Sequence, residues 1–132
     1  MKDKAPVKGF LLDTTALIDF FRGNKHTIAL LEVLKEKAPL AACPITVAEV
    51  FSGAREKELP AIELFLSSLK FYPIDYEASR LAGRWRYTYA RKGITLSLTD
   101  SLIAAVAVRN NLILVTANER HYPIEELIIL TH

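Results

Sequence analysis

Three acidic side chains occupy comparable positions in the secondary structure that the sequence predicts. Asp13 directly follows the apolar run 9–12, and Glu49 and Asp100 are each expected in the first turn of a helix. In an open parallel sheet, such positions lie beyond the carboxyl ends of the strands, where ligands bind. We therefore expect these three carboxylates to converge on one pocket, although they are far apart in the chain.

Carboxylates brought close together repel one another, and a divalent cation among them relieves that repulsion. Mg²⁺ or Mn²⁺ suits such a site because both ions take hard oxygen ligands and keep several waters. The ion can activate a water and stabilise the charge that builds on a phosphodiester during in-line displacement. Hydrolysis of phosphodiester bonds is the reaction that this predicted site favours.

Each acid also has a purely structural explanation. Asp13 could be a plain helix N-cap, and the segments 46–49 and 97–100 both fit the capping box, in which an acid three residues after Thr or Ser bonds back to the backbone. Taken singly, each acid is better explained as a cap. The joint placement of the three acids is what favours a shared site.

A fourth segment, 114–118, predicts a strand that ends in small polar residues at the same edge of the sheet. Thr116 and Asn118 could bind a metal-linked water or orient a carboxylate. The alternative is a simple Asx or Ser/Thr turn, which needs no ligand.

The spacing of apolar residues predicts an α/β fold, a three-layer α/β/α sandwich with a mostly parallel sheet of about five strands. We expect an N-terminal tail over residues 1–8 and a single domain over residues 9–132. The strands are predicted at 9–12, 40–43, 71–74, 112–115 and 128–130, and the helices at 14–21, 27–37, 46–57, 60–69, 77–92 and about 102–108.

Composition limits the function classes. The 132 residues carry 17 Lys+Arg against 15 Asp+Glu, so the formal net charge of +2 does not by itself indicate nucleic-acid binding. Any contact with a polyanion needs local clustering of basic residues.

The longest apolar run is too short to span a bilayer, so we expect a cytoplasmic protein with no membrane partner. The single cysteine, Cys43, excludes an intramolecular disulfide, and its apolar neighbours favour a core residue over a reactive thiol.

The order of these motifs resembles the PIN domain, especially the VapC-type toxin ribonucleases of VapBC toxin–antitoxin pairs. The segments that carry the resemblance are FLLDTTALIDFF, ITVAEVFSGA, SLTDSLIAAVAV and LVTANERHY, which together span nearly the whole chain. The resemblance implies that Asp13, Glu49 and Asp100 form the metal site. It also implies that Thr15 is a supporting hydroxyl.

The closing motif departs from the family pattern. Many members place an acid where Asn118 stands, although Asn also occurs there, and the position of His121 is often Asp. Asn118 adds no charge, so a site with one tight ion is as plausible as a site with two. Glu119 could replace the missing acid, but an exposed loop charge is the simpler explanation. His121 is expected to be structural, so both residues are left outside the site.

The resemblance further implies a Mg²⁺-dependent endoribonuclease that acts on RNA, pairs as a homodimer and is inhibited by a small cognate antitoxin lying across the active-site groove. The apolar side chains that could form an antitoxin or dimer surface, if they are not all core, are Ile18, Phe20, Phe21, Leu59, Ile62 and Phe65.

The helix predicted at 77–92 carries Arg80, Arg84, Tyr87 and Arg91 along one line. Arginine and tyrosine combine charge with a stacking plane, which suits single-stranded or looped RNA. A solvated helix face is an equally good interpretation.

Two other classes of protein share part of this pattern. A phosphoryl-transfer domain also places an Asp after its first strand, but a haloacid-dehalogenase-type phosphatase needs a second acid where Thr15 stands, and a receiver domain needs paired acids that are missing here. A non-catalytic RNA- or protein-binding scaffold gains some weight from the absence of an acid at position 118.

Overall fold

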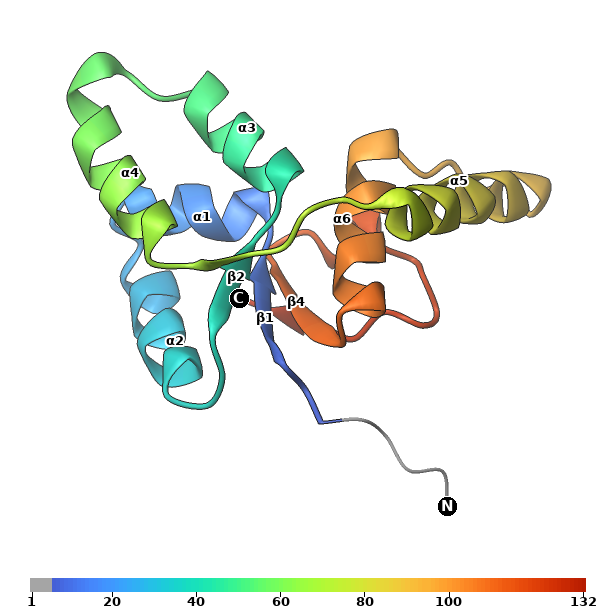
Figure 1. The fold of residues 1–132 in the computed structure, drawn as a ribbon, viewed down its shortest axis with the longest axis horizontal. Helices are drawn as coiled ribbons and strands as arrows, with labels where there is room; N and C mark the ends of the chain where they lie inside the picture. Colours follow the sequence, from blue (N-terminus) through green and yellow to red (C-terminus); the bar gives the residue numbers. More distant parts are fainter. Residues whose placement is uncertain (1–5) are drawn as a thin grey trace.

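The computed structural model describes residues 6–132, and the sheet at its centre has five parallel strands in the order β3-β2-β1-β4-β5 (Figure 1). The predicted α/β/α sandwich is confirmed. Residues 1–5 of the expected tail lie outside the described residues, while residues 6–8 have neither helix nor strand. The strands are β1 (Gly9–Leu12), β2 (Leu40–Ala42), β3 (Lys70–Phe71), β4 (Leu112–Thr116) and β5 (Ile129–Thr131).

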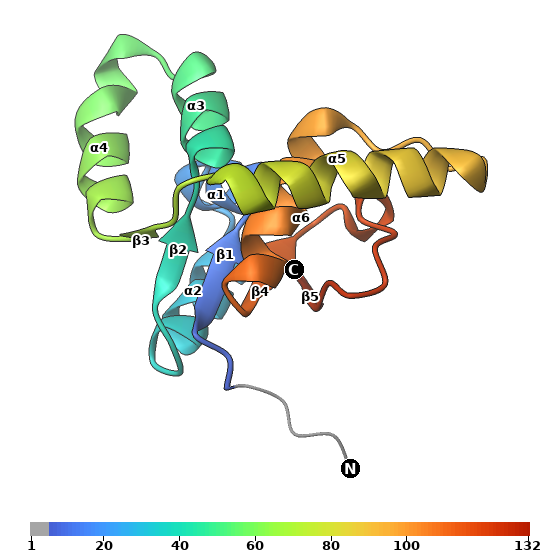
Figure 2. The same cartoon turned by 45° about the vertical axis from the view of Figure 1, so that its right-hand side comes forward.

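Within residues 6–132, six helices cover the sheet, four on one face and two on the other (Figures 1 and 2). The same residues include two short 3₁₀ turns, η1 (Glu56–Glu58) and η2 (Glu119–His121). The helices are α1 (Thr14–Phe21), α2 (Lys25–Lys35), α3 (Pro44–Ser52), α4 (Leu59–Ser67), α5 (Tyr76–Arg91) and α6 (Leu98–Arg109).

The central strands alternate their side chains between two cores. In β1, Phe10 and Leu12 pack into the core under α1 to α4, whereas Leu11 packs into the core under α5 and α6. This alternation follows from the two-residue period of a strand, and both faces are apolar because helices cover both. The side chains of Leu11, Leu12 and Leu114 are fully buried.

The sheet has a topological switch point between β1 and β4. Strands β2 and β3 add to one side of β1, while β4 and β5 add to the other side. Ligands of doubly wound sheets bind in the crevice at such a topological switch point, beyond the carboxyl ends of the strands. Here the two strands that flank the switch point end at Leu12 and Thr116, so the residues that follow them face this crevice.

The third helix begins two residues before the predicted 46–57 and ends five residues earlier, and the third strand begins one residue before the predicted 71–74 and ends three residues earlier. Pro44 begins α3 because Cys43 is its N-cap, and the Thr46 hydroxyl lies 3.2 Å from the Cys43 nitrogen and 3.0 Å from its carbonyl oxygen. Proline suits a first helical position, since its missing N–H would have no partner there. The capping box predicted for 46–49 is therefore wrong, and Glu49 lies in the second turn rather than the first. The strand predicted at 71–74 is the shorter Lys70–Phe71.

Among residues 6–132, no helix is long and apolar enough to cross a membrane.

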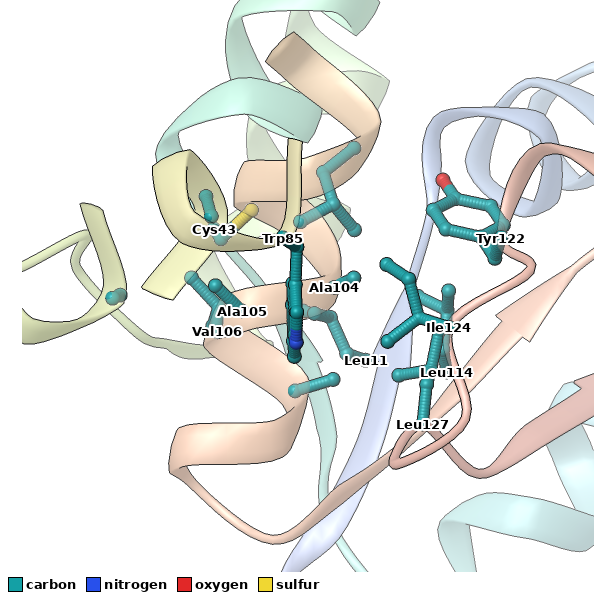
Figure 3. Close-up of a cluster of buried hydrophobic side chains, with 14 of the residues drawn as sticks. Leu11, Cys43, Trp85, Ala104, Ala105, Val106, Leu114, Tyr122, Ile124 and Leu127 are labelled. Carbon is teal, nitrogen blue, oxygen red and sulfur yellow. The ribbon is translucent and has the colours of Figure 1, made fainter. Parts of the chain in front are cut away.

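Cys43 lies in the core under α5 and α6, close to Trp85 (Figure 3). Its side chain is fully buried, and burial raises the pKa of its thiol above the ordinary value. The thiolate is the reactive form. Both effects indicate an inert structural thiol.

We predict that Cys43 in the folded protein resists iodoacetamide at the pH where a free thiol already ionises, because the raised pKa keeps it protonated and the core excludes the reagent. Mass spectrometry after timed labelling measures this, with the protein unfolded in guanidinium chloride as the positive control. Labelling at the rate of the unfolded chain would contradict the prediction.

Candidate active site

Asp13 is the most buried acid at the switch point. It follows β1, only 2% of its side chain surface is exposed, and its Oδ1 accepts hydrogen bonds from the Ala16 amide at 3.0 Å and from Thr15 Oγ1 at 2.6 Å. Asp13 is therefore the N-cap of α1, as the structural interpretation predicts. The cap occupies Oδ1, so Oδ2 is left to face the neighbouring loop.

Thr15 connects the ends of the two central strands. Its hydroxyl donates to Asp13 and accepts a hydrogen bond from the Ala117 amide at 3.0 Å. The residue predicted as a supporting hydroxyl thus contacts both the carboxylate and the segment after β4.

Thr116 and Asn118 form a local turn in that segment. The Thr116 hydroxyl is fully buried and accepts a hydrogen bond from the Asn118 amide at 2.9 Å, which is the Ser/Thr turn that the sequence left open. The Asn118 side chain is exposed and lines a surface hollow together with Glu119 and His121.

Tyr122 brings Asp13 and Asp100 to one hydroxyl. Its side chain is buried, its hydroxyl donates to Asp13 Oδ2 at 3.4 Å, and the Asp100 carboxylate lies near enough to act on the same hydroxyl. Burial first, and then the negative charges of both carboxylates, raise the pKa of Tyr122 far above its ordinary value. The hydroxyl therefore stays protonated at neutral pH and remains a hydrogen-bond donor.

Asp100 lies in the first turn of α6. Ser97 is the N-cap of this helix, and the Asp100 amide donates to the Ser97 hydroxyl at 3.1 Å. The carboxylate of Asp100 points towards the loop after β4, where its Oδ2 lies 3.7 Å from His121 Nδ1. His121 therefore lies next to the acidic group formed by Asp13 and Asp100, although its side chain is largely exposed.

Glu49 reaches the same edge from α3 but lies apart from the other two acids. Its Oε1 accepts a short hydrogen bond from the hydroxyl of Thr14, the residue directly after Asp13. Within residues 6–132, no three His, Cys, Asp or Glu side chains form a group that could hold a metal ion. The structure therefore does not gather Asp13, Glu49 and Asp100 as three direct ligands of one ion.

The residues present still fit a hydrated Mg²⁺ or Mn²⁺ ion. Two carboxylates converge on one hydroxyl, and Mg²⁺ is usually held by one or two carboxylates, with waters and substrate phosphates as its other ligands. The set offers hard oxygens and no thiolate, which suits Mg²⁺ or Mn²⁺ better than Zn²⁺.

The predicted basic stripe lies elsewhere, on the exposed side of α5. All four of its side chains are exposed, and the guanidinium groups of Arg84 and Arg91 lie 4.5 Å and 3.9 Å from the centre of the Tyr87 ring. It forms a surface of its own, separate from the acidic group.

Sequence reasoning missed Thr14 and Tyr122. Tyr122 is 109 residues from Asp13 in the chain, so no local spacing connects them. The available signal was the position of Tyr122 shortly after β4, where a loop at the switch point can fold back over the end of β1. In the sequence Thr14 looks like any threonine in the first turn of a helix. Its contact with Glu49 depends on the position of α3 in the fold.

Comparisons with known proteins identify the family of this chain. The PIN domain family matches residues 10–127. Ribonuclease VapC19 of Mycobacterium tuberculosis is 35% identical over 116 residues, which is 86% of this chain and 91% of the relative. The tRNA(fMet)-specific endonuclease VapC of Salmonella typhimurium is 30% identical over 118 residues, which is 86% of this chain and 89% of the relative.

Solved structures with the same fold include VapBC from Salmonella typhimurium bound to DNA, with a TM-score of 0.83, 27% identity and coverage of 95% of this chain and 98% of that chain. VapBC2 from Rickettsia felis, bound to a promoter DNA fragment, has a TM-score of 0.79, 28% identity and coverage of 92% and 97%. Both structures hold a toxin with its antitoxin. The chain belongs to the PIN-domain family and, within it, to the VapC group.

Proposed function

We propose that this chain is a VapC-type endoribonuclease that hydrolyses RNA phosphodiester bonds with Mg²⁺ or Mn²⁺, works in the cytoplasm as a homodimer and is inhibited by a cognate antitoxin. The convergence of Asp13 and Asp100 on the Tyr122 hydroxyl at the switch point is the observation that carries the proposal. Relatives named as a ribonuclease and as a tRNA-specific endonuclease, at 35% and 30% identity, support it over the scaffold and phosphoryl-transfer alternatives.

Asp13 and Asp100 hold the ion in this proposal. A bound divalent ion supplies Lewis-acid stabilisation of the phosphodiester and lowers the pKa of a water. Asp13 is fixed by two bonds to Oδ1, so its Oδ2 has a defined direction towards Tyr122. A ligand already held in place loses little freedom when the ion binds.

Glu49, Thr15 and Asn118 have supporting roles in the proposed reaction. Glu49 would act as the third carboxylate near the ion, and Thr14 orients the Glu49 carboxylate by a short hydrogen bond. Thr15 holds Asp13, while Asn118 offers a neutral oxygen to the ion or its water. The buried hydroxyl of Thr116 fixes the turn that presents Asn118.

The proposed antitoxin surface adjoins Glu49. A hollow of about 370 Å³ lies between α1, α3 and α4, and its lining includes Ile18, Phe21 and Ile62 together with Arg22 and Glu49. Apolar walls with a few charged groups at the rim are typical of a protein-binding groove. A segment seated there would cover the approach to Glu49.

The first prediction for this function concerns Asp13→Asn and Asp100→Asn. Asparagine caps a helix about as well as aspartate, so Asp13→Asn removes the charge and keeps the cap. We expect each substitution to lower the divalent-ion-dependent cleavage of total cellular RNA by about a hundredfold or more.

The matched control is Asp75→Asn. Asp75 caps α5 through a 2.8 Å bond from the Ala78 amide, just as Asp13 caps α1, but it lies outside the acidic group. This variant should cleave RNA like the parent. If both active-site variants also cleave like the parent, the proposed function is wrong.

The second prediction concerns the orienting hydroxyl. Tyr122→Phe removes the donor shared by Asp13 and Asp100, and loss of such an orienting group typically weakens metal binding by about 10- to 100-fold. Calorimetric titration with Mn²⁺ measures the affinity. Tyr89→Phe is the control, since the hydroxyl of Tyr89 contacts the Glu125 amide instead. Equal Mn²⁺ affinity in both variants and the parent would contradict the role given to Tyr122.

A further inference from the structure

Helix α5 carries more net positive charge than the whole chain. The whole sequence has a formal net charge of only +2, yet α5 holds four arginines and one glutamate. All four arginines are exposed, and none makes an ion pair with a carboxylate anywhere in the range 6–132. Arg80, Arg84 and Arg91 lie along one line of the helix, and unpaired guanidinium groups clustered in this way are the electrostatic footprint expected of a polyanion site.

Tyr87 orders two of these arginines. Arg84 and Arg91 lie over its half-exposed ring, and Arg91 also donates to the Tyr87 carbonyl at 3.1 Å. A planar group stacked on an aromatic ring has lost part of its side-chain freedom already. Less entropy is then lost when these side chains bind phosphate.

An open cleft runs beside this cluster. It has a volume of about 380 Å³ and lies between α5 and the segment 94–96, which leads from α5 to α6. Arg86 fixes that segment through a 2.9 Å bond from its Nε to the Leu96 carbonyl. The residues that line the cleft are Gly83, Arg86, Tyr87, Ala90, Arg91, Ile94, Thr95 and Leu96, and none is acidic.

The segment that lines the cleft continues into α6, the helix that carries Asp100. Ser97 caps α6 directly after Leu96, and Asp100 follows three residues later. Even a fully extended chain would place Thr95 at most about 18 Å from Asp100. A short strand of nucleic acid could therefore contact the cleft and Asp100 together. Figure 2 shows α5 lying against α6, the helix that carries Asp100.

We propose that this cleft is an RNA-binding subsite that holds the strand on one side of the phosphodiester cleaved at Asp13 and Asp100. Its position beside the reacting group rests on the proposed function. Its ligand is single-stranded or looped RNA because guanidinium groups bind phosphate in a bidentate manner and an exposed tyrosine between them can stack on a base. An acidic protein surface would use the charge but not this stacking arrangement.

Gly83 offers a sharp test because it lies in the cleft wall. A Cβ atom at this position meets nothing within 4 Å, so a side chain can be added without a clash, and glycine in a helix interior costs stability relative to other residues. Gly83→Glu places a negative charge among Arg86, Tyr87 and Arg91. Gly83→Gln has nearly the same size and no charge, so it is the matched control.

The experiment measures binding of a short fluorescein-labelled single-stranded RNA by fluorescence anisotropy, in EDTA and with Asp100→Asn in every protein, so that no RNA is cleaved. We expect Gly83→Glu to bind about tenfold more weakly than Gly83→Gln. Arg84→Ala with Arg91→Ala should also reduce the dependence of log affinity on log salt by about 0.7 per lost phosphate contact.

A second charge control lies far from the cleft. Lys37→Glu alters an exposed residue after α2, and it should bind RNA like the parent if the cleft, rather than net charge, holds the strand. Equal RNA binding by the Gly83→Glu and Gly83→Gln variants would overturn the proposal. So would a Gly83→Glu variant that binds a cognate antitoxin more weakly but binds RNA as well as the Gly83→Gln variant. If instead the proposed nuclease function is wrong, the cleavage assay will show it, because the Asp13→Asn variant and the parent will cleave RNA at the same rate.

Discussion

The buried carboxylate of Asp13 is the interaction on which the proposed site depends. A charge without partners in the interior would cost several kcal/mol, roughly 3–5 when one member of a buried pair is removed. Asp13 offsets this cost with bonds from the Ala16 amide, the Thr15 hydroxyl and the Tyr122 hydroxyl. These donors come from the start of α1 and from the loop after β4, so the carboxylate holds together the two segments that flank the switch point.

This arrangement gives one residue two functions. The oxygen that caps α1 cannot move without loss of the cap, and the other oxygen is thereby directed to the point that Asp100 also reaches. The structural and the chemical interpretation of Asp13 are therefore compatible. For Glu49 the structural interpretation fails, because Thr46 and Cys43 take the capping role. The Glu49 carboxylate is therefore available at the rim, where it accepts a hydrogen bond from Thr14.

The layers of the fold and the edge that carries Asp13 and Asp100 could be predicted from the sequence, because apolar periodicity fixes which segments are strands and parallel strands place their carboxyl ends together. Helix α1 and strand β1 were predicted with their observed bounds. The approach of Tyr122 to both acids could not be predicted from the sequence, since it depends on how the loop after β4 folds back. The start of α3 at Pro44 and not at Thr46 was also not predicted.

The most direct test is a crystal structure of the protein grown with Mn²⁺, read from anomalous difference density. We expect one strong peak bonded to carboxylate oxygens of Asp13 and Asp100 at about 2.1 Å, close to the Mg²⁺–oxygen distance, with Tyr122 still donating to one of the two acids. A fully occupied peak held by other residues, or saturating Mn²⁺ with no peak between these two aspartates, would contradict the proposed metal site.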